Sequence, residues 1–386
     1  MVIGLKEKII KKAKRIGIDK IGFTTADPFD YLRESLIEQK KNNHTSGFEH
    51  QNIDERLYPE LIFDQPKTII SIALAYPSVS KETIPQEKGK RRGSFARASW
   101  GRDYHFILKE HMSLLVEYMK EEVPGAKFKS MVDTGELIDV AVAQRAGIGF
   151  IGRNGLLITE EYGSWVYLGE IITDIEIEPD EPIENGCGDC MRCVQYCPPS
   201  ALLADGRMNA KKCLSYQTQA KEYMPEKYRR RMTTVIYGCD ICQLVCPYNQ
   251  GKSYHLHEEM EPKLDREFPV LLDMLDLSNR EFKNQFGELA GSWRGRKPLQ
   301  RNAIIALANS RDETALPKLI QLVENDPRPM IRGTAAWAIS RIQKYYNQVL
   351  IDCLEEQRSR EEDQSTINEM TKSIEVLKKK RLPKDD

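Results

Sequence analysis

The chain has 386 residues, and its hydrophobic content of 40% beside a charged content of 30% is ordinary for a globular protein of two or three domains. The formal net charge of −1 excludes a uniformly basic nucleic-acid binder but leaves room for a local basic face. No stretch approaches the roughly 20 apolar residues that span a bilayer, and no signal peptide opens the chain, so we expect a cytoplasmic protein without membrane contact. In that compartment nine cysteines favour metal ligation over disulfides.

The N-terminal part, residues 1 to about 178, is predicted to be a layered α/β domain. A lysine-rich amphipathic helix opens it, because apolar residues recur at helical spacing within the first 15 residues. Short apolar runs predict strands, and longer periodic runs predict helices between them. The expected strands cover residues 68–76, 156–159 and 164–172, and the expected helices cover residues 106–122 and 136–146.

Asp133 lies just before the second of these helices, three positions ahead of Glu136. An acidic residue at that spacing from a glutamate makes a good helix cap, so a structural role alone accounts for it. A carboxyl in the same place also suits a general acid, provided that its pKa is raised. Both interpretations stay open on these residues alone.

Residues 147–152 fit the dinucleotide-binding pattern G-x-G-x-x-G. That pattern holds a pyrophosphate only where it follows a strand and begins a helix. Here a predicted helix comes first and a predicted strand follows, so we exclude nicotinamide binding. We interpret the glycines as the end of the helix and a point of close approach by another segment or a ligand.

A boundary is predicted at residues 179–182, which read Pro-Asp-Glu-Pro. The region that follows, residues 179–255, holds eight of the nine cysteines and little apolar sequence. A small domain with so little apolar core needs bound metal centres for stability, so we expect a ferredoxin-like fold.

The cysteines form two runs, C-x-x-C-x-x-C-x-x-x-C-P and C-x-x-C-x-x-x-C-P. This spacing is typical of two four-iron, four-sulfur clusters, because the cysteine before the proline ligates the cluster of the other run. Zinc also uses C-x-x-C pairs, but seldom three cysteines at this spacing followed by Cys-Pro. One cluster is predicted to bind Cys187, Cys190, Cys193 and Cys246, and the other Cys197, Cys239, Cys242 and the remaining cysteine of the region, Cys213.

The C-terminal part, residues 256–386, is predicted to be helical, with a repeat from about residue 296. Each repeat unit is a pair of amphipathic helices that bury their apolar faces only by stacking, as in HEAT-like repeats. The ninth cysteine, Cys353, fits a buried apolar position of the repeat. Residues 301–308 match residues 332–339, and residues 319–324 match residues 350–355 at the same offset.

The chain resembles the epoxyqueuosine reductase family, whose core is similar to that of corrinoid reductive dehalogenases. The resemblance rests on both cysteine runs together with residues 101–105, 132–135 and 149–155, and it extends over nearly the whole chain. It implies reduction of an epoxide on the modified wobble base of tRNA to an alkene, giving queuosine. It also implies cobalamin and two 4Fe–4S clusters as cofactors, a monomer, and an external electron donor of the flavodoxin or ferredoxin type.

The same resemblance implies roles for single residues. Asp133 matches the proton donor of the family, with a pKa raised by burial against corrin and substrate, and it also lines the cofactor pocket. Cobalamin is expected to bind without a protein histidine on cobalt, since the chain lacks a D-x-H-x-x-G motif. For each remaining pocket residue taken singly, a salt bridge or ordinary packing is an equal alternative. These residues are Arg56, Arg97, Asn154, Ile158 and Leu168, with Ser215 and Asp240 beside the cluster cysteines.

Three groups of basic residues are candidates for contact with tRNA, although charge runs are usually solvated faces. They cover residues 221–231, 294–301 and 378–381. The second group follows Trp293 and leads into the repeats, which present extended surfaces. We therefore expect Arg294, Lys297 and Arg301 to bind phosphates while a flipped base enters the cofactor pocket.

Two other functions fit parts of the sequence. A corrinoid dehalogenase shares the cofactors, but that group usually carries an export signal and lacks a repeat tail. A dicluster electron carrier docked through its repeats accounts for the cysteines but not for the large N-terminal domain.

Overall fold

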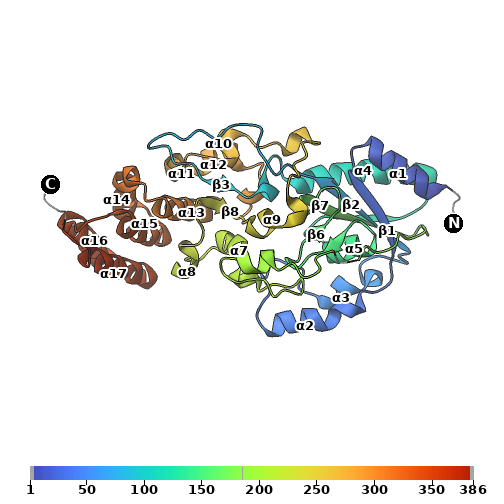
Figure 1. The fold of residues 1–386 in the computed structure, drawn as a ribbon, viewed down its shortest axis with the longest axis horizontal. Coiled ribbons are helices and arrows are strands. Elements are labelled where there is room, and N and C mark those ends of the chain that lie inside the picture. The colour runs from blue at the N-terminus through green and yellow to red at the C-terminus, as the bar shows by residue number, and fades with distance from the viewer. Residues whose placement is uncertain (1–3, 185, 383–386) are drawn as a thin grey trace. The chain divides into compact units, whose positions relative to one another are not determined.

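The computed structural model describes residues 4–184 and 186–382, which form two compact units, each assembled from discontinuous segments (Figure 1). The first unit comprises residues 4–80, 102–184, 186–213 and 240–261. The second comprises residues 81–101, 214–239 and 262–382. The division at residues 178 and 255 stays a prediction.

The first unit is built on a four-stranded sheet with the order β1-β2-β7-β4, in which every neighbouring pair is antiparallel. Strand β2 is buried along its whole length, as its unbroken apolar run predicts. Two further strands, β5 (Phe150–Ile151) and β6 (Leu157–Ile158), pair separately. The sheet strands are β1 (Lys20–Thr25), β2 (Thr68–Ala75), β4 (Phe128–Met131) and β7 (Val166–Thr173).

Helices cover both faces of this sheet (Figure 1). Helix α4 (Tyr104–Glu122) packs on one face, where Met112 lies against Gly169, and α1 (Leu5–Arg15) packs beside it. Helix α5 (Asp139–Arg145) packs on the other face against β1, β2 and β7. Shorter helices complete the unit: α2 (Arg33–Lys41), α3 (Ile53–Leu57), α6 (Arg192–Tyr196) and α9 (Ile241–Leu244).

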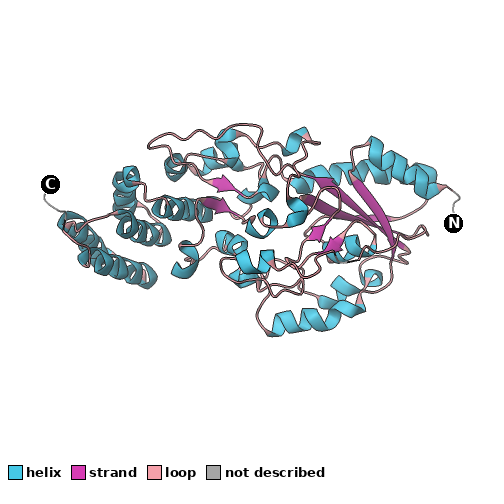
Figure 2. Ribbon diagram, viewed as in Figure 1, coloured by secondary structure: helices cyan, strands magenta, loops and turns pink. Residues whose placement is uncertain are grey.

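The second unit is almost wholly helical, with one short parallel strand pair, β3 (Ser94–Phe95) and β8 (Val235–Tyr237) (Figure 2). The predicted repeat is confirmed: α13 (Arg296–Asn309) and α14 (Leu316–Asn325) are followed by α15 (Pro329–Ile342) and α16 (Gln348–Arg360). The other helices are α7 (Leu214–Gln219), α8 (Glu226–Arg229), α10 (Leu264–Glu267), α11 (Leu271–Asp276), α12 (Asn279–Phe286) and α17 (Gln364–Lys378).

Arg301 on α13 is fully buried in the core of the second unit. Its guanidinium donates hydrogen bonds to the carbonyl oxygens of Gln217 at 2.9 Å and Ala220 at 2.7 Å, and also to that of Glu222. These bonds satisfy carbonyls at the end of α7, which have no partner within the helix. Arg301 therefore has a structural role, and its expected contact with tRNA phosphate is wrong.

The mixed architecture agrees with the predicted fold class of a layered α/β domain and helical repeats. Of the helices formed by residues 4–184 and 186–382, none combines the length and the apolar character needed to cross a bilayer.

Candidate active site

Asp133 lies in a tight turn after β4, and its carboxylate is held by two side chains from the start of α4. The hydroxyl of Tyr104 donates a hydrogen bond of 3.0 Å to Oδ2. Nε2 of His105 lies 3.5 Å from the same oxygen, an ion-pair distance longer than a hydrogen bond. The Asp133 side chain is 57% exposed, so a substrate can reach it.

The capping role proposed for Asp133 is wrong. Helix α5 begins only at Asp139, after Ile138, and no side chain caps it. Glu136, the supposed cap partner, pairs with Lys129 at 2.7 Å. Asp133 itself has φ +51°, in the left-handed region that non-glycine residues adopt uncommonly and in which Asn, Asp and His are enriched. Such a backbone conformation marks a candidate functional position.

His105 is fixed in place by its own helix. Asp103 precedes α4 and accepts hydrogen bonds from the backbone N–H of His105 at 3.0 Å and from Nδ1 of its ring at 2.7 Å. The ring stacks on Tyr104 with 4.2 Å between centroids, and Tyr104 stacks in turn on Tyr167 at 4.5 Å. A histidine between two carboxylates is therefore positioned to carry a proton.

The pKa values of His105 and Asp133 differ, so a proton shared by the two side chains resides mainly on His105. Burial opposes the charged ring of His105, but the contacts with Asp103 and Asp133 outweigh it and raise the pKa to about 9. His105 and then Tyr104 hold the pKa of Asp133 below its ordinary value, against the effect of burial. In this structure the pKa of Asp133 is thus lowered because His105 stabilises the carboxylate, and a rise through burial against corrin and substrate stays a prediction.

Two further carboxyl groups, those of Asp139 and Glu170, interact electrostatically with Asp133. Burial and then the charge of Asp133 raise the pKa of Asp139, at the start of α5, to about 7. Glu170 on β7 is fully buried, and neither carboxyl oxygen has a hydrogen-bond partner among the described residues. Burial, then the charge of Asp139, raises the pKa of Glu170 well above its ordinary value, because water no longer solvates the charged form. Arg56 on α3 acts electrostatically on Asp139, which ties this predicted pocket residue to the site.

The glycine-rich segment forms a close backbone crossing, as the sequence predicts. Gly147 follows the end of α5 with φ +71°, and a side chain on Gly149 would strike the backbone of Ile158. Asn154 is buried, and its Nδ2 has no partner within the described chain. The Nε of Arg153 likewise has no hydrogen-bond partner within the described chain, although the two terminal nitrogens of Arg153 donate to backbone carbonyls. This segment therefore holds buried donors without acceptors.

The other predicted pocket residues are divided between the units. Ile158 on β6 is buried, and Leu168 on β7 packs against the cluster of residues under α5. Asp240 lies just before α9 in the first unit. Arg97 and Ser215 belong to the second unit, where Arg97 lies over the ring of Trp100 at 5.4 Å and Ser215 accepts a hydrogen bond of 3.2 Å from Gln219.

Four cysteines of the first unit lie close enough to interact electrostatically, namely Cys187, Cys190, Cys193 and Cys246. They come from both runs, because α6 packs on α9. Burial, joined by the other thiols of this group, raises the pKa of both Cys193 and Cys246. Four thiols that meet in this way need a positively charged centre before they can ionise together.

The remaining thiols are more dispersed. The Sγ of Cys197 accepts a hydrogen bond of 3.3 Å from the backbone N–H of Ala201, and Cys242 lies on α9. Cys213 is the last residue of a first-unit segment, whereas Cys239 is the last residue of a second-unit segment. Among the described residues, no group of three or more His, Cys, Asp or Glu side chains is arranged around a single metal ion. Cys353 is half-buried on α16, with its thiol 3.7 Å from Glu324.

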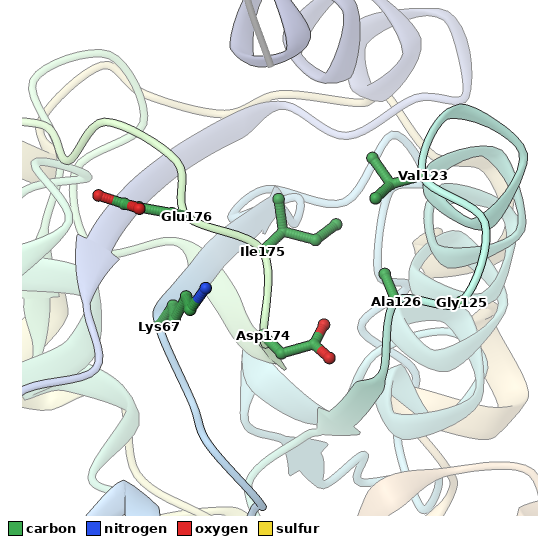
Figure 3. Close-up of a pocket in the computed structure, with 7 residues that line it drawn as sticks. All are labelled: Lys67, Val123, Gly125, Ala126, Asp174, Ile175 and Glu176. Carbon is green, nitrogen blue, oxygen red and sulfur yellow. The ribbon is translucent and has the colours of Figure 1, made fainter. Parts of the chain in front are cut away.

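A hollow of about 320 Å³ on the first unit is separate from these groups (Figure 3). Its lining places Lys67, Asp174 and Glu176 on one side and the turn of residues 123–126 on the other. None of the predicted site residues lines it.

Of the basic residues expected to meet tRNA, Lys297 is exposed and Arg294 is partly exposed. Arg294 lies over the ring of Trp293 at 4.6 Å, and its Nε donates to the carbonyl of Gln219 at 3.0 Å. Trp293 is 52% exposed, which is unusual for so large an aromatic ring and suits stacking on a base.

Three segments of the chain match known family profiles. The matches are "Epoxyqueuosine reductase QueG, DUF1730" at residues 56–134, "4Fe-4S double cluster binding domain" at residues 186–249 and "HEAT repeats" at residues 294–375. The last two confirm the predicted double-cluster segment and the helical repeats.

The chain is similar over most of its length to proteins of one kind. An epoxyqueuosine reductase of Listeria monocytogenes is 59% identical over 338 residues, which are 88% of this chain and 89% of that protein. A crystal structure of epoxyqueuosine reductase with a tRNA-Tyr epoxyqueuosine-modified stem loop has a TM-score of 0.94 at 50% identity and covers 98% of this chain and 100% of that one. The Bacillus subtilis enzyme, with its aspartate-bearing catalytic loop swung out of the active site, matches with a TM-score of 0.94 at 49% identity and the same coverage.

Proposed function

We propose that this chain, which belongs to the epoxyqueuosine reductase family of oxidoreductases, reduces epoxyqueuosine to queuosine at the wobble position of tRNA in the cytoplasm. The observation that carries the proposal is the exposed carboxylate of Asp133, held by two proton-bearing side chains in the unit that also gathers four thiols. An acid beside an electron-carrying centre is what reductive opening of an epoxide requires.

The overall reaction consumes two electrons and two protons. One carbon–oxygen bond of the epoxide breaks with uptake of electrons, and the ring oxygen takes a proton as it becomes a hydroxyl. The second carbon–oxygen bond then breaks as the alkene forms, and the oxygen leaves as water after a second protonation. The protein must therefore deliver two protons to the same oxygen.

Asp133 and His105 act together as the proton source. The pair holds one shared proton, which resides on His105 at rest and reaches the oxygen through the exposed carboxyl of Asp133. Tyr104 orients the carboxyl through its hydrogen bond, and Asp103 keeps the ring of His105 in place. After one transfer the pair is recharged from solvent for the second.

Cobalamin fits the donors of the glycine-rich segment. When bound, it supplies a low-valent cobalt that reduces the epoxide carbon. Its peripheral amide groups offer carbonyl acceptors, which Asn154 Nδ2 and Arg153 Nε lack in the protein itself. Ile158 and Leu168 would provide the apolar wall, with Arg56, Arg97, Ser215 and Asp240 as further predicted contacts.

Two 4Fe–4S clusters would pass electrons inward from an external low-potential donor of the flavodoxin or ferredoxin type. Cys187, Cys190, Cys193 and Cys246 would bind one cluster, and their mutual proximity supports this. Cys197, Cys213, Cys239 and Cys242 would bind the other. The chain would act as a monomer.

On the tRNA side, Lys297 and Arg294 would contact phosphate, and the exposed ring of Trp293 would stack on a base. Arg301 is left out of this surface because it is buried.

Turnover by the reconstituted protein tests the function. Protein prepared without oxygen and supplied with cobalamin should contain roughly eight irons per chain, show a corrin spectrum, and convert epoxyqueuosine in tRNA to queuosine with a chemical reductant. Mass spectrometry of digested tRNA measures the product. A protein that binds both cofactors but leaves the epoxide intact would refute the function, and omission of cobalamin is the control.

The pH dependence of turnover tests the Asp133–His105 pair. Wild-type single-turnover rates should stay level up to pH of about 9, the pKa of His105, and fall above it as the shared proton is lost. In His105→Gln the proton must come from Asp133 alone, whose pKa lies far below that of His105, so the decline should begin at much lower pH than in the wild type and the rate at pH 8 should be on the order of 10²-fold lower. The cobalt is reduced beforehand, so that electron supply does not limit the rate.

Stability gives a second reading of the same pair. Because the pKa of His105 in the folded protein is above its ordinary 6.5, the ion pair stabilises the fold fully below pH 6.5 and loses that effect as pH rises through about 9. His105→Gln should remove this part of the pH dependence of the melting temperature. An unchanged rate profile in the variant would show that His105 does not supply the proton.

A further inference from the structure

We propose that four cations of the second unit, Arg230, Arg311, Arg341 and Lys380, form a binding site for a backbone phosphate of tRNA. These residues are called the four-cation cluster below. The proposal rests on the proposed function, because it assumes that tRNA is the substrate. It concerns residues that sequence reasoning did not connect, since they come from both outer basic groups and from two helices of the repeat.

The fold brings the four residues together at the ends of helices. Asn309, the last residue of α13, donates hydrogen bonds to the carbonyls of Arg229 at 2.8 Å and Thr233 at 3.2 Å, which places the end of α13 against the loop that carries Arg230. The backbone N–H of Tyr346, just after α15, donates to the carbonyl of Arg381 at 2.9 Å. That bond places the end of α15 against the end of α17.

The cluster carries more positive than negative charge. Burial, then Arg230 and Arg311, lowers the pKa of Arg341, and burial, then Arg311 and Arg341, lowers that of Lys380. Glu226 is the carboxylate that acts on Arg341, and it is already hydrogen-bonded to Arg230. Within residues 4–184 and 186–382, Glu226 is the carboxylate shown to act on Arg341, and a bound anion would offset the repulsion among the four cations.

The ordinary explanation for cations at such places is the partial negative charge of helix C-termini. It leaves one atom unexplained: the Nε of Arg341 is buried, yet it has no hydrogen-bond partner in the described part of the chain. Neighbouring cations differ in this respect, since Arg332 pairs with Glu361 and Lys378 with Glu355, both at 2.7 Å. A phosphate group would supply both the missing acceptor and the missing charge.

The position of the cluster suits a nucleic acid. Lys297 lies in the first turn of α13 and Arg311 lies two residues beyond its end, so this 14-residue helix separates the two basic surfaces by about 21 Å at 1.5 Å per residue. A nucleic-acid backbone longer than about 21 Å can therefore contact both surfaces.

Binding measurements on Arg341→Gln combined with Lys380→Gln test the site. Affinity for full-length tRNA bearing epoxyqueuosine should fall by about 10- to 100-fold at roughly 0.1 M salt. The slope of log affinity against log salt should become shallower by about 2, because each phosphate contact releases about 0.9 counterion. Fluorescence anisotropy between roughly 50 and 200 mM salt gives both values. The same tRNA without the modified base should lose as much, since a phosphate contact reads no base.

The matched control is Arg360→Gln combined with Lys318→Gln, which removes the same net charge from cations that are already paired with Glu356 and Asp276. Its salt slope should change by less than about 0.5. An equal loss in both double variants would mean a general field effect and would overturn the proposal.

Folding and function are checked separately. The substitutions relieve repulsion between like charges, so iron content and melting temperature should be kept; if Arg341→Gln proves unstable, Arg311→Gln combined with Lys380→Gln replaces it. If wild type binds and reduces tRNA while the variants keep its affinity and slope, the cluster is not a phosphate site and the proposed function stands. If wild type neither binds nor reduces tRNA, the proposed function fails and this inference fails with it.

Discussion

Asp133→Asn should lower single-turnover reduction of the epoxide by about 10²-fold or more while both cofactors still bind, because the amide cannot release a proton. The comparison needs tRNA that bears the epoxide and cobalt reduced beforehand, so that the chemical step is measured. Rapid quenching followed by mass spectrometry of the nucleosides gives the rate. Equal turnover by Asp133→Asn and wild type would mean that another group supplies the proton.

The backbone of Asp133 provides the control for folding. With φ +51°, this position suits asparagine as well as aspartate, so Asp133→Asn should lose only the contribution of its ion pair with His105 to the melting temperature. Alanine in the same conformation costs about 1 kcal/mol, so Asp133→Ala should lose both activity and some stability. Since Asp133 caps no helix, a large stability loss in the asparagine variant would contradict the structure.

The carboxyl groups of Asp139 and Glu170 influence how readily Asp133 delivers protons to the epoxide oxygen. Burial raises the pKa of Glu170 and brings that of Asp139 to about 7, so both groups favour their neutral forms more than ordinary carboxyls do. A fully ionised carboxylate in either place would raise the pKa of Asp133 by repulsion between like charges. Because burial disfavours the charged form of Glu170, His105 has the largest effect on the pKa of Asp133.

Local sequence patterns predicted much of this architecture. The buried strand at residues 68–75 and the helices of the repeat followed from periodicity alone, because each buries a face that its pattern marks. The predicted order of a helix before Gly147 and a strand after Gly149 is confirmed by α5 and β5. The cysteine runs predicted an iron–sulfur region because their spacing follows from ligand geometry.

The parts that failed depend on contacts between distant segments. The sequence predicts a helix cap at Asp133 because Glu136 follows it three positions later. In the structure Glu136 instead pairs with Lys129 on β4, the strand just before Asp133. Arg301 looks like a surface cation, whereas its donors close the carbonyl end of a helix some 80 positions earlier, around Gln217. The proton-carrying role of His105 appears only when α4 and the turn after β4 meet. In the sequence, the only indication of a role for His105 is the family motif at residues 101–105.

Cys246→Ser should remove one cluster, with loss of about four of roughly eight irons per chain, and reduce turnover with an external protein donor to background. The thiol belongs to the second cysteine run but lies with Cys187, Cys190 and Cys193 of the first, so the same cluster should disappear in Cys190→Ser. Iron analysis and paramagnetic resonance of the reduced protein measure what remains. Cys353→Ser on α16 is the matched control and should keep all of the iron.

Double variants separate the pairing between runs from simpler alternatives. Cys190→Ser with Cys246→Ser should lose no more iron than either single change, because both thiols would hold the same cluster. Cys213→Ser should remove the other cluster, so its combination with Cys246→Ser should leave almost no iron. If each run instead bound its own cluster, Cys190→Ser with Cys246→Ser would empty both sites. Zinc in place of iron at these thiols would refute the cluster assignment altogether, since the electron path to the Asp133 site depends on a centre that can change its charge.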